Sequence, residues 1–162
     1  MGINLVFLDV DGVLNCKTTE DKCNGYRGIE DSKVALLKEL VDKTNSKIIL
    51  VSTWKLFWYR RKIHKDKQDD LANYLDQKLS NYGLIIYDKT REYDIHNRGE
   101  GVIRYINKLE HKGIKINKYV ILDDELFDYL NAKLTDHLIQ TDFENGGLQE
   151  KHIKKAIEKM AD

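Results

Sequence analysis

The chain has 162 residues, in which 27 Lys and Arg balance 27 Asp and Glu, with 41% hydrophobic and 33% charged residues. This length is enough for one domain with a sizeable core and short for two, so we expect a single domain over residues 1–162. The balanced charge gives no global field that attracts nucleic acid or a membrane surface, and no apolar run is long enough to cross a bilayer.

The N-terminus and the cysteines indicate the compartment. The first apolar run begins at Ile3, which leaves no room for a secretory signal peptide. We therefore expect a cytoplasmic protein, in which Cys16 and Cys23 are free thiols; a disulfide between them is the alternative.

The apolar run from Ile3 to Leu8 is typical of a strand buried on both faces, as found inside a parallel sheet. Asp9 and Asp11 follow it, and because side chains two apart on a strand face the same way, both carboxylates would project from its C-terminal edge. Ligands of open α/β sheets bind there, and a Mg²⁺ ion relieves the repulsion between such carboxylates. Gly12 allows a sharp turn, and an ordinary turn or cap is the alternative interpretation.

The rest of the chain alternates helices with strands. A polar loop or hairpin flap over 15–29 comes first. Helical patterns cover 31–43, 70–79, 99–111 and 148–160, and strand patterns cover 47–51, 84–87, 119–122 and 137–140, with a short helical or irregular piece at 127–134. This alternation predicts an α/β fold with a mostly parallel five-stranded sheet and right-handed crossovers.

Residues 55–67 are rich in aromatic and basic side chains, and they form either a helix or a mobile loop. One interpretation is a surface that faces a nucleotide or nucleic-acid substrate. The other is a surface segment whose aromatic rings pack on the core while its charges face water.

Polar groups follow several of the predicted strands. Because the carboxyl ends of parallel strands share one edge of the sheet, we expect these side chains to converge there, together with Arg98 at a helix start: Asp9, Asp11, Ser52, Thr53, Asp123 and Asp124. Ser52–Thr53 and Asp123–Asp124 have an alternative interpretation as helix caps.

This ordered set resembles the haloacid dehalogenase-like (HAD) superfamily of phosphohydrolases. More narrowly, the chain is similar to a small branch related to the phosphatase domains of RNA-repair proteins, and the similarity spans almost the whole chain. The resemblance rests on segments 7–15, 51–55, 98–100, 120–124, 140–142 and 147–148. It implies a three-layer α/β/α Rossmann-like core. The intervals 15–32 and 54–98 leave no room for a true cap domain.

The resemblance also implies roles for individual residues. Asp9 would attack phosphorus to give an aspartyl-phosphate, and Asp11 would protonate the leaving oxygen and then activate water. The implied metal ligands are Asp9, the main-chain carbonyl of Asp11, Asp123 and the supporting Asp124. Ser52 would donate to a phosphoryl oxygen, with Thr53 as its substitute.

A basic residue is expected to hold the phosphate, and Arg98 occupies the corresponding position. Lys89, Arg91 and Lys115 are alternatives that lie nearby in the sequence. Gly12, Thr53 and Lys55 are the further residues that we expect to contact the substrate.

These observations predict a Mg²⁺-dependent phosphomonoesterase. One alternative is a phosphatase that acts on nucleotides or nucleic-acid ends, and the other is a noncatalytic module that binds a phosphorylated ligand or a protein. The expected partner is a phosphorylated substrate, without a membrane and without an obligate protein partner.

Overall fold

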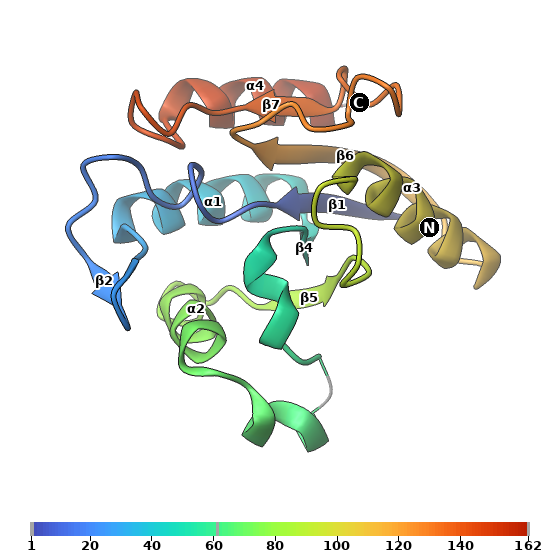
Figure 1. Cartoon of the computed structure of the whole chain (residues 1–162). Coiled ribbons are helices and arrows are strands. Elements are labelled where there is room, and N and C mark those ends of the chain that lie inside the picture. The colour runs from blue at the N-terminus through green and yellow to red at the C-terminus, as the bar shows by residue number, and fades with distance from the viewer. Residues whose placement is uncertain (1, 61, 162) are drawn as a thin grey trace.

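The computed structural model describes residues 2–60 and 62–161. Five parallel strands form the central sheet in the order β5-β4-β1-β6-β7 (Figure 1). The strands are β1 (Ile3–Leu8), β4 (Ser46–Leu50), β5 (Ile86–Lys89), β6 (Ile116–Asp123) and β7 (Leu138–Gln140). The fold is therefore the expected α/β, Rossmann-like one.

Four helices cover the sheet: α1 (Asp31–Thr44), α2 (Asp70–Ser80), α3 (Arg98–His111) and α4 (Glu150–Met160). Side chains alternate across β1, so Val6 and Leu8 pack in one core with residues of α1, α2 and α4. Leu5 and Phe7 pack in the second core with residues of α3. Figure 1 shows α1 beside α4 and away from α3, so the sheet is the middle of three layers.

Short elements fill the two intervals in which larger relatives of this fold carry a cap domain. A hairpin of β2 (Lys22–Cys23) and β3 (Tyr26–Arg27) follows β1, and the 3-10 helices η1 (Thr53–Phe57) and η2 (Lys62–Lys67) precede α2. Figure 1 shows the hairpin beside α2. Within the described residues neither interval holds a folded cap, as the sequence predicted.

Local differences from the predicted elements have physical reasons. The strand predicted at 84–87 is β5, which begins at Ile86 because this edge strand pairs with β4 only from Ile86 onward. Ile85 is apolar but precedes the strand, and its side chain is 76% exposed. Glu30 is the N-cap position of α1, whereas Asp69 caps α2 through a bond from the Ala72 amide. Residues 55–57 end the 3-10 helix η1 and residues 62–67 form η2, whereas the sequence predicted either one helix or a mobile loop.

Other expectations concern the cysteines and membranes. Cys16 and Cys23 are free thiols, as expected. None of the helices in the described ranges has both the length and the apolar character that crossing a bilayer requires.

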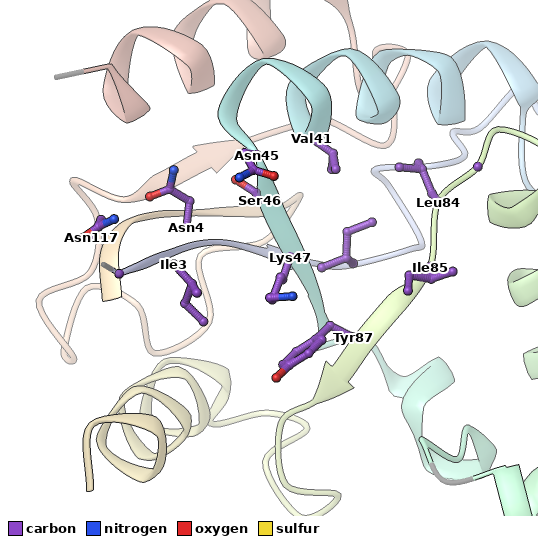
Figure 2. Close-up of a pocket in the computed structure, with 13 residues that line it drawn as sticks. Ile3, Asn4, Val41, Asn45, Ser46, Lys47, Leu84, Ile85, Tyr87 and Asn117 are labelled. Carbon is purple, nitrogen blue, oxygen red and sulfur yellow. The ribbon is translucent and has the colours of Figure 1, made fainter. Parts of the chain in front are cut away.

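A cavity of about 420 Å³ lies at the N-terminal ends of the central strands (Figure 2). Asn4 at the start of β1 and Lys47 at the start of β4 line it, together with Ile85 and Tyr87. Because Asp9 and Asp123 lie at the opposite ends of their strands, this cavity is separate from the acidic residues that the sequence singled out.

Candidate active site

The strand order brings Asp9, directly after β1, close to Asp123 at the end of β6. The chain builds the sheet outward from β1 through β4 to β5, and then crosses back to place β6 on the other side of β1. Such a reversal opens a crevice at the carboxyl ends of the two adjacent strands. The Asp9 amide donates to the Leu122 carbonyl at 2.9 Å, which continues the β1–β6 pairing to the point where Asp9 and Asp123 meet.

Asp9, Asp123 and Asp124 form a carboxylate cluster in which one oxygen from each side chain lies within 4.8 Å of the others. Asp9 and Asp123 are buried. Burial, and then repulsion from Asp123, raises the pKa of Asp9, although Arg98 opposes the shift. Burial and the same neighbour raise the pKa of Asp124 to about 6.

The donor set of this cluster fits a hard divalent cation. Mg²⁺ prefers carboxylate oxygens, and a positive ion among the three side chains would offset the repulsion that contributes to the raised pKa values of Asp9 and Asp124. The Asp11 carboxylate is not part of this set, and the Asn15 and Trp54 side chains donate to it.

Arg98 is the basic residue at the cluster. Its Nη1 lies 3.0 Å from Asp9 Oδ1 and 2.8 Å from Asp123 Oδ2, and the side chain is 6% exposed. Burial alone would lower the pKa of Arg98, but the two carboxylates raise it, so the guanidinium stays charged. Arg98 thus links the carboxylates that follow β1 and end β6.

The loop after β6 fixes where α3 begins and hence where Arg98 lies. The Asp128 carboxylate accepts hydrogen bonds from the Gly99 amide at 2.6 Å and the Glu100 amide at 3.0 Å. These amides have no partner inside the helix, so a carboxylate there stabilises the helix start. Phe127, from the same loop, lies with its ring 4.2 Å from the Arg98 guanidinium carbon.

Tyr129 also reaches the cluster from this loop. Its hydroxyl donates to Asp123 Oδ2 at 2.8 Å, and the side chain is fully buried. Burial, and then the charge of Asp123, raises the pKa of Tyr129 well above its usual value, so the phenol stays protonated and remains a donor. Asp123 therefore accepts from both Tyr129 and Arg98 through one oxygen.

Asp11 is exposed, and two neighbours hold its carboxylate. The Trp54 indole Nε1 donates to Asp11 Oδ2 at 3.0 Å, and the Asn15 amide donates to Asp11 Oδ1 at 2.9 Å. Asn15 Oδ1 in turn accepts from the Gly12 amide at 2.9 Å. Each oxygen of Asp11 thus has a fixed donor, and the side chain remains open to solvent.

Gly12 allows the turn after β1 to approach Asp124 closely. Its φ is +81°, and a Cβ at this position would collide with the Asp124 carboxylate. The Gly12 carbonyl accepts from the Thr141 hydroxyl at 2.6 Å, which ties the turn to the residue after β7. Only glycine satisfies both the backbone conformation and the space.

Ser52 and Thr53 follow β4 at the same edge of the sheet. The Ser52 hydroxyl oxygen accepts from the Trp54 amide at 3.2 Å, so this residue forms the N-cap of η1. The capping interpretation therefore describes its geometry, and the hydroxyl hydrogen remains available for donation. Ser52 is buried, whereas Thr53 is exposed.

Lys55 does not reach the exposed part of the site. The side chain is fully buried, and its ammonium donates to the Thr90 hydroxyl and to the Asp94 carbonyl, both at 2.8 Å. Burial, and then the positive charge of Arg98, lowers the pKa of Lys55 to about 8. Contact between Lys55 and the substrate stays a prediction, which this burial disfavours.

The alternatives to Arg98 have other partners. Lys89 donates to the main-chain carbonyls of Lys55 and Trp58, and Arg91 pairs with Asp94 at 3.2 Å. Lys115 precedes β6 and so lies at the opposite edge of the sheet.

The basic segment over 55–67 is held largely by structural contacts. Arg60 pairs with Asp88 at 3.3 Å, Lys65 pairs with Asp76 at 3.0 Å, and Trp58 is buried. Arg61 lies outside the described residues. These contacts favour the interpretation of a surface segment that packs on the core, with Trp58 buried and Arg60 facing water, although the Phe57 ring is exposed and Lys55 is buried.

The sequence assigned no role to Tyr129 or Asn15, and for Trp54 it favoured a position in the core over a surface that stacks on the substrate. Trp54 is indeed 6% exposed and packs in the core with α2, but it also holds Asp11. Asn15 carried a signal, since it lies four residues beyond Asp11 in a polar turn. Tyr129 carried none, because its position depends on the irregular loop after β6.

A family model described as the HAD domain in Swiss Army Knife RNA repair proteins matches residues 5–153. The comparison with curated proteins found no match. The family match covers almost the whole described chain and confirms the resemblance carried by the motifs. The protein therefore belongs to the HAD domain family of Swiss Army Knife RNA repair proteins.

Proposed function

We propose that the protein is a metal-dependent phosphomonoesterase that works through an aspartyl-phosphate on Asp9. One observation carries the proposal: Arg98 and the acidic cluster surround a carboxylate at the sheet's switch point, with a second, exposed carboxylate two residues further on. Family membership supports a phosphatase-type hydrolase.

Asp9 is the nucleophile in this proposal. One of its oxygens attacks phosphorus, the bond from phosphorus to the leaving oxygen breaks, and water then hydrolyses the resulting acyl phosphate. A carboxylate is nucleophilic only when ionised, and Arg98 at 3.0 Å favours that form against the burial that opposes it. The same guanidinium offsets negative charge on the phosphoryl group.

Asp11 is the general acid and base. It gives a proton to the leaving oxygen in the first step and takes one from the attacking water in the second. Trp54 and Asn15 donate to its two oxygens and so restrict its rotation, while its exposure leaves it accessible to a substrate. Ser52 donates to a phosphoryl oxygen, with Thr53 as its substitute, and the positive φ of Gly12 allows the chain to turn directly after Asp11.

Asp9, Asp123 and Asp124 would hold the metal, together with the main-chain carbonyl of Asp11. The proposed ion is Mg²⁺, which supplies positive charge that lets an anionic nucleophile approach an anionic phosphate. Tyr129 fixes the orientation of Asp123 in this set.

The substrate is a phosphorylated molecule. The family description, which refers to RNA repair proteins, favours a nucleotide or a nucleic-acid end as the narrower alternative. A noncatalytic binding module is the remaining alternative. The single domain over 1–162, the cytoplasmic location and the lack of an obligate protein partner stay predictions.

Hydrolysis of an aryl phosphate with and without Mg²⁺ tests the function. We expect metal-dependent turnover in the wild type and at least a thousandfold less in Asp9→Asn, an order of magnitude chosen because loss of a nucleophile removes the covalent route. Asp136→Asn, an exposed aspartate away from the site, is the control.

Two results would contradict the proposal. Turnover that survives in Asp9→Asn would exclude Asp9 as the nucleophile. An absence of turnover on aryl phosphates, nucleotides and phosphorylated oligonucleotides, combined with tight Mg²⁺-dependent binding of phosphate, would favour the binding module.

A further inference from the structure

A second cavity, of about 380 Å³, adjoins the Asp11 side of the candidate active site. Three parts of the chain enclose it: the tip of the β2–β3 hairpin, η1 and the start of α2. Thr53 and Trp54 belong to its lining, and Trp54 is also the residue that donates to Asp11. The cavity therefore begins where the proposed proton donor to the leaving group is held.

Two exposed aromatic side chains line this cavity. Tyr26 on the hairpin is 65% exposed and Phe57 at the end of η1 is 55% exposed, although large aromatic groups are usually covered. Leu56 and Leu71 add partly buried apolar surface. Exposed rings that share a concave site with a buried Trp are typical of a surface that binds a flat apolar group.

The hairpin that carries Tyr26 is attached to the body of the protein. Asn24 Nδ2 donates to Asp70 Oδ2 at 3.0 Å, and the Ile29 amide donates to the Tyr74 hydroxyl at 2.9 Å. Tyr74 in turn packs against Trp54, with 6.5 Å between ring centres. These contacts link Tyr26 to the residue that holds Asp11.

Charge limits which groups fit. Asp69 and Asp70 line the cavity, and among the described residues that line it there is no Lys or Arg. A second phosphate placed there would meet carboxylates without a compensating cation, whereas a neutral ring would not. The cavity therefore suits an uncharged aromatic group and disfavours a continuing polyphosphate or polynucleotide chain.

We propose that the cavity between the β2–β3 hairpin and η1 binds a flat, uncharged aromatic leaving group of the phosphate ester. The proposal rests on the proposed function, because the group lies beside Asp11 only if Asp11 faces the leaving oxygen. Tyr26 and Phe57 are the specificity residues, and a nucleobase and a simple aryl ring share the chemistry that they recognise.

Matched substrates test the site. Adenosine 5′-phosphate and ribose 5-phosphate carry the same phosphate on the same sugar and differ by the base, while 2-naphthyl phosphate and glycerol 2-phosphate compare a simple aryl ring with an aliphatic group. Each variant is compared with the wild type on the same substrate, so that differences in leaving-group reactivity cancel. Steady-state kcat/KM is the measured quantity.

The variants are Tyr26→Ala and Phe57→Ala, with Tyr26→Phe as the conservative replacement that keeps the ring. Loss of one stacking ring is expected to lower kcat/KM for an aromatic substrate by about fivefold to a hundredfold. The expected change for ribose 5-phosphate and glycerol 2-phosphate is less than twofold, and Tyr26→Phe is expected to retain most of the aromatic preference. Ile85→Ala, an exposed apolar side chain at the opposite sheet edge, is the control.

The results distinguish a substrate whose ring is a nucleobase from one whose ring is a simple aryl group. A loss confined to adenosine 5′-phosphate identifies a nucleobase, and a loss confined to 2-naphthyl phosphate identifies a simple aryl group; either supports the site. Equal losses on aromatic and aliphatic substrates, or no loss on any, would overturn it.

A binding measurement separates this proposal from the proposed function. Adenosine and 2-naphthol carry no phosphate, and Trp54 lines the cavity, so binding is followed by tryptophan fluorescence in the wild type and in Phe57→Ala. If no substrate is hydrolysed but either compound binds more weakly to Phe57→Ala, the function fails and the aromatic site stands. If substrates are hydrolysed and neither compound binds, the function stands and the site fails.

Discussion

Replacing Arg98 with Met tests the electrostatic account of the site. The guanidinium is 6% exposed and contacts Asp9 at 3.0 Å and Asp123 at 2.8 Å, so the variant leaves buried carboxylates without their cation. Removing one partner of a buried ion pair costs about 3–5 kcal/mol. In a protein of this size each kcal/mol lowers Tm by roughly 2–4 °C, which gives an expected decrease of about 6–20 °C without metal.

Arg104→Met is the matched control, on the same helix. Arg104 is about half exposed; its pair with Glu100 at 2.7 Å contributes only about 0–1 kcal/mol, and its contact with the buried Asp94 carboxylate is longer, at 3.7 Å. Thermal unfolding and urea denaturation of both variants, in a chelator and then in Mg²⁺, provide the comparison.

The response to Mg²⁺ distinguishes lost charge from lost packing. If the Arg98 charge matters, Mg²⁺ stabilises Arg98→Met more than it stabilises the wild type, because the ion no longer competes with a guanidinium for the same carboxylates. Lost contact with the Phe127 ring would not depend on metal. A decrease no larger than that of Arg104→Met would refute the reasoning, as would equal Mg²⁺ stabilisation of both proteins.

Three further predictions concern neighbouring residues. Trp54→Phe keeps a ring but removes the indole donor to Asp11 at 3.0 Å, so we expect about a tenfold lower kcat with little change in Tm; an unchanged kcat would exclude a positioning role. Gly12→Ala puts a Cβ at φ +81° against Asp124, and the urea midpoint should fall by an amount equivalent to about 1–3 kcal/mol; an unchanged midpoint would contradict the close approach. Burial lowers the pKa of Lys55 from 10.5 to about 8, so above pH 8 the unfolded chain binds more protons than the folded one. The stability of the wild type is therefore expected to rise relative to that of Lys55→Met between about pH 8 and 10.5. A constant difference in stability across that range, measured by urea denaturation, would show that the pKa is not lowered.

The layout of the sheet could be predicted from the sequence because its strands are buried. Continuous apolar runs such as Ile3–Leu8 leave few alternatives, and the predicted bounds of β1 are those observed. The edge strand β5 was shifted by two residues, since Leu84 and Ile85 have the same apolar character as the strand but no pairing partner on β4. The proximity of Asp9 and Asp123 could also be predicted, because the carboxyl ends of parallel strands share one edge of the sheet and this depends only on topology.

The surroundings of Asp9 and Asp123 depend on the conformation of loops, which the periodicity of apolar residues along the sequence does not predict. Tyr129 reaches Asp123 through an irregular segment, and nothing in the spacing of the chain marks it. Lys55 looked like part of a basic surface, yet its side chain turns inward to Thr90 and Asp94. The partners of Lys55 lie far away in the sequence, whereas Tyr129 lies close to Asp123 in the sequence and reaches it through the conformation of the loop.

The bond from the Thr141 hydroxyl to the Gly12 carbonyl joins positions 129 residues apart. Lys33 reaches the Gly146 carbonyl in a similar way, across 113 residues. Closing such long loops is entropically unfavourable until the strands between them have paired, so these contacts form late in folding. During synthesis the strand that presents Asp9 emerges well before Asp123 and Asp124. A growing chain that has not passed Asp124 therefore lacks two of the three carboxylates of the acidic cluster and cannot assemble the proposed metal site.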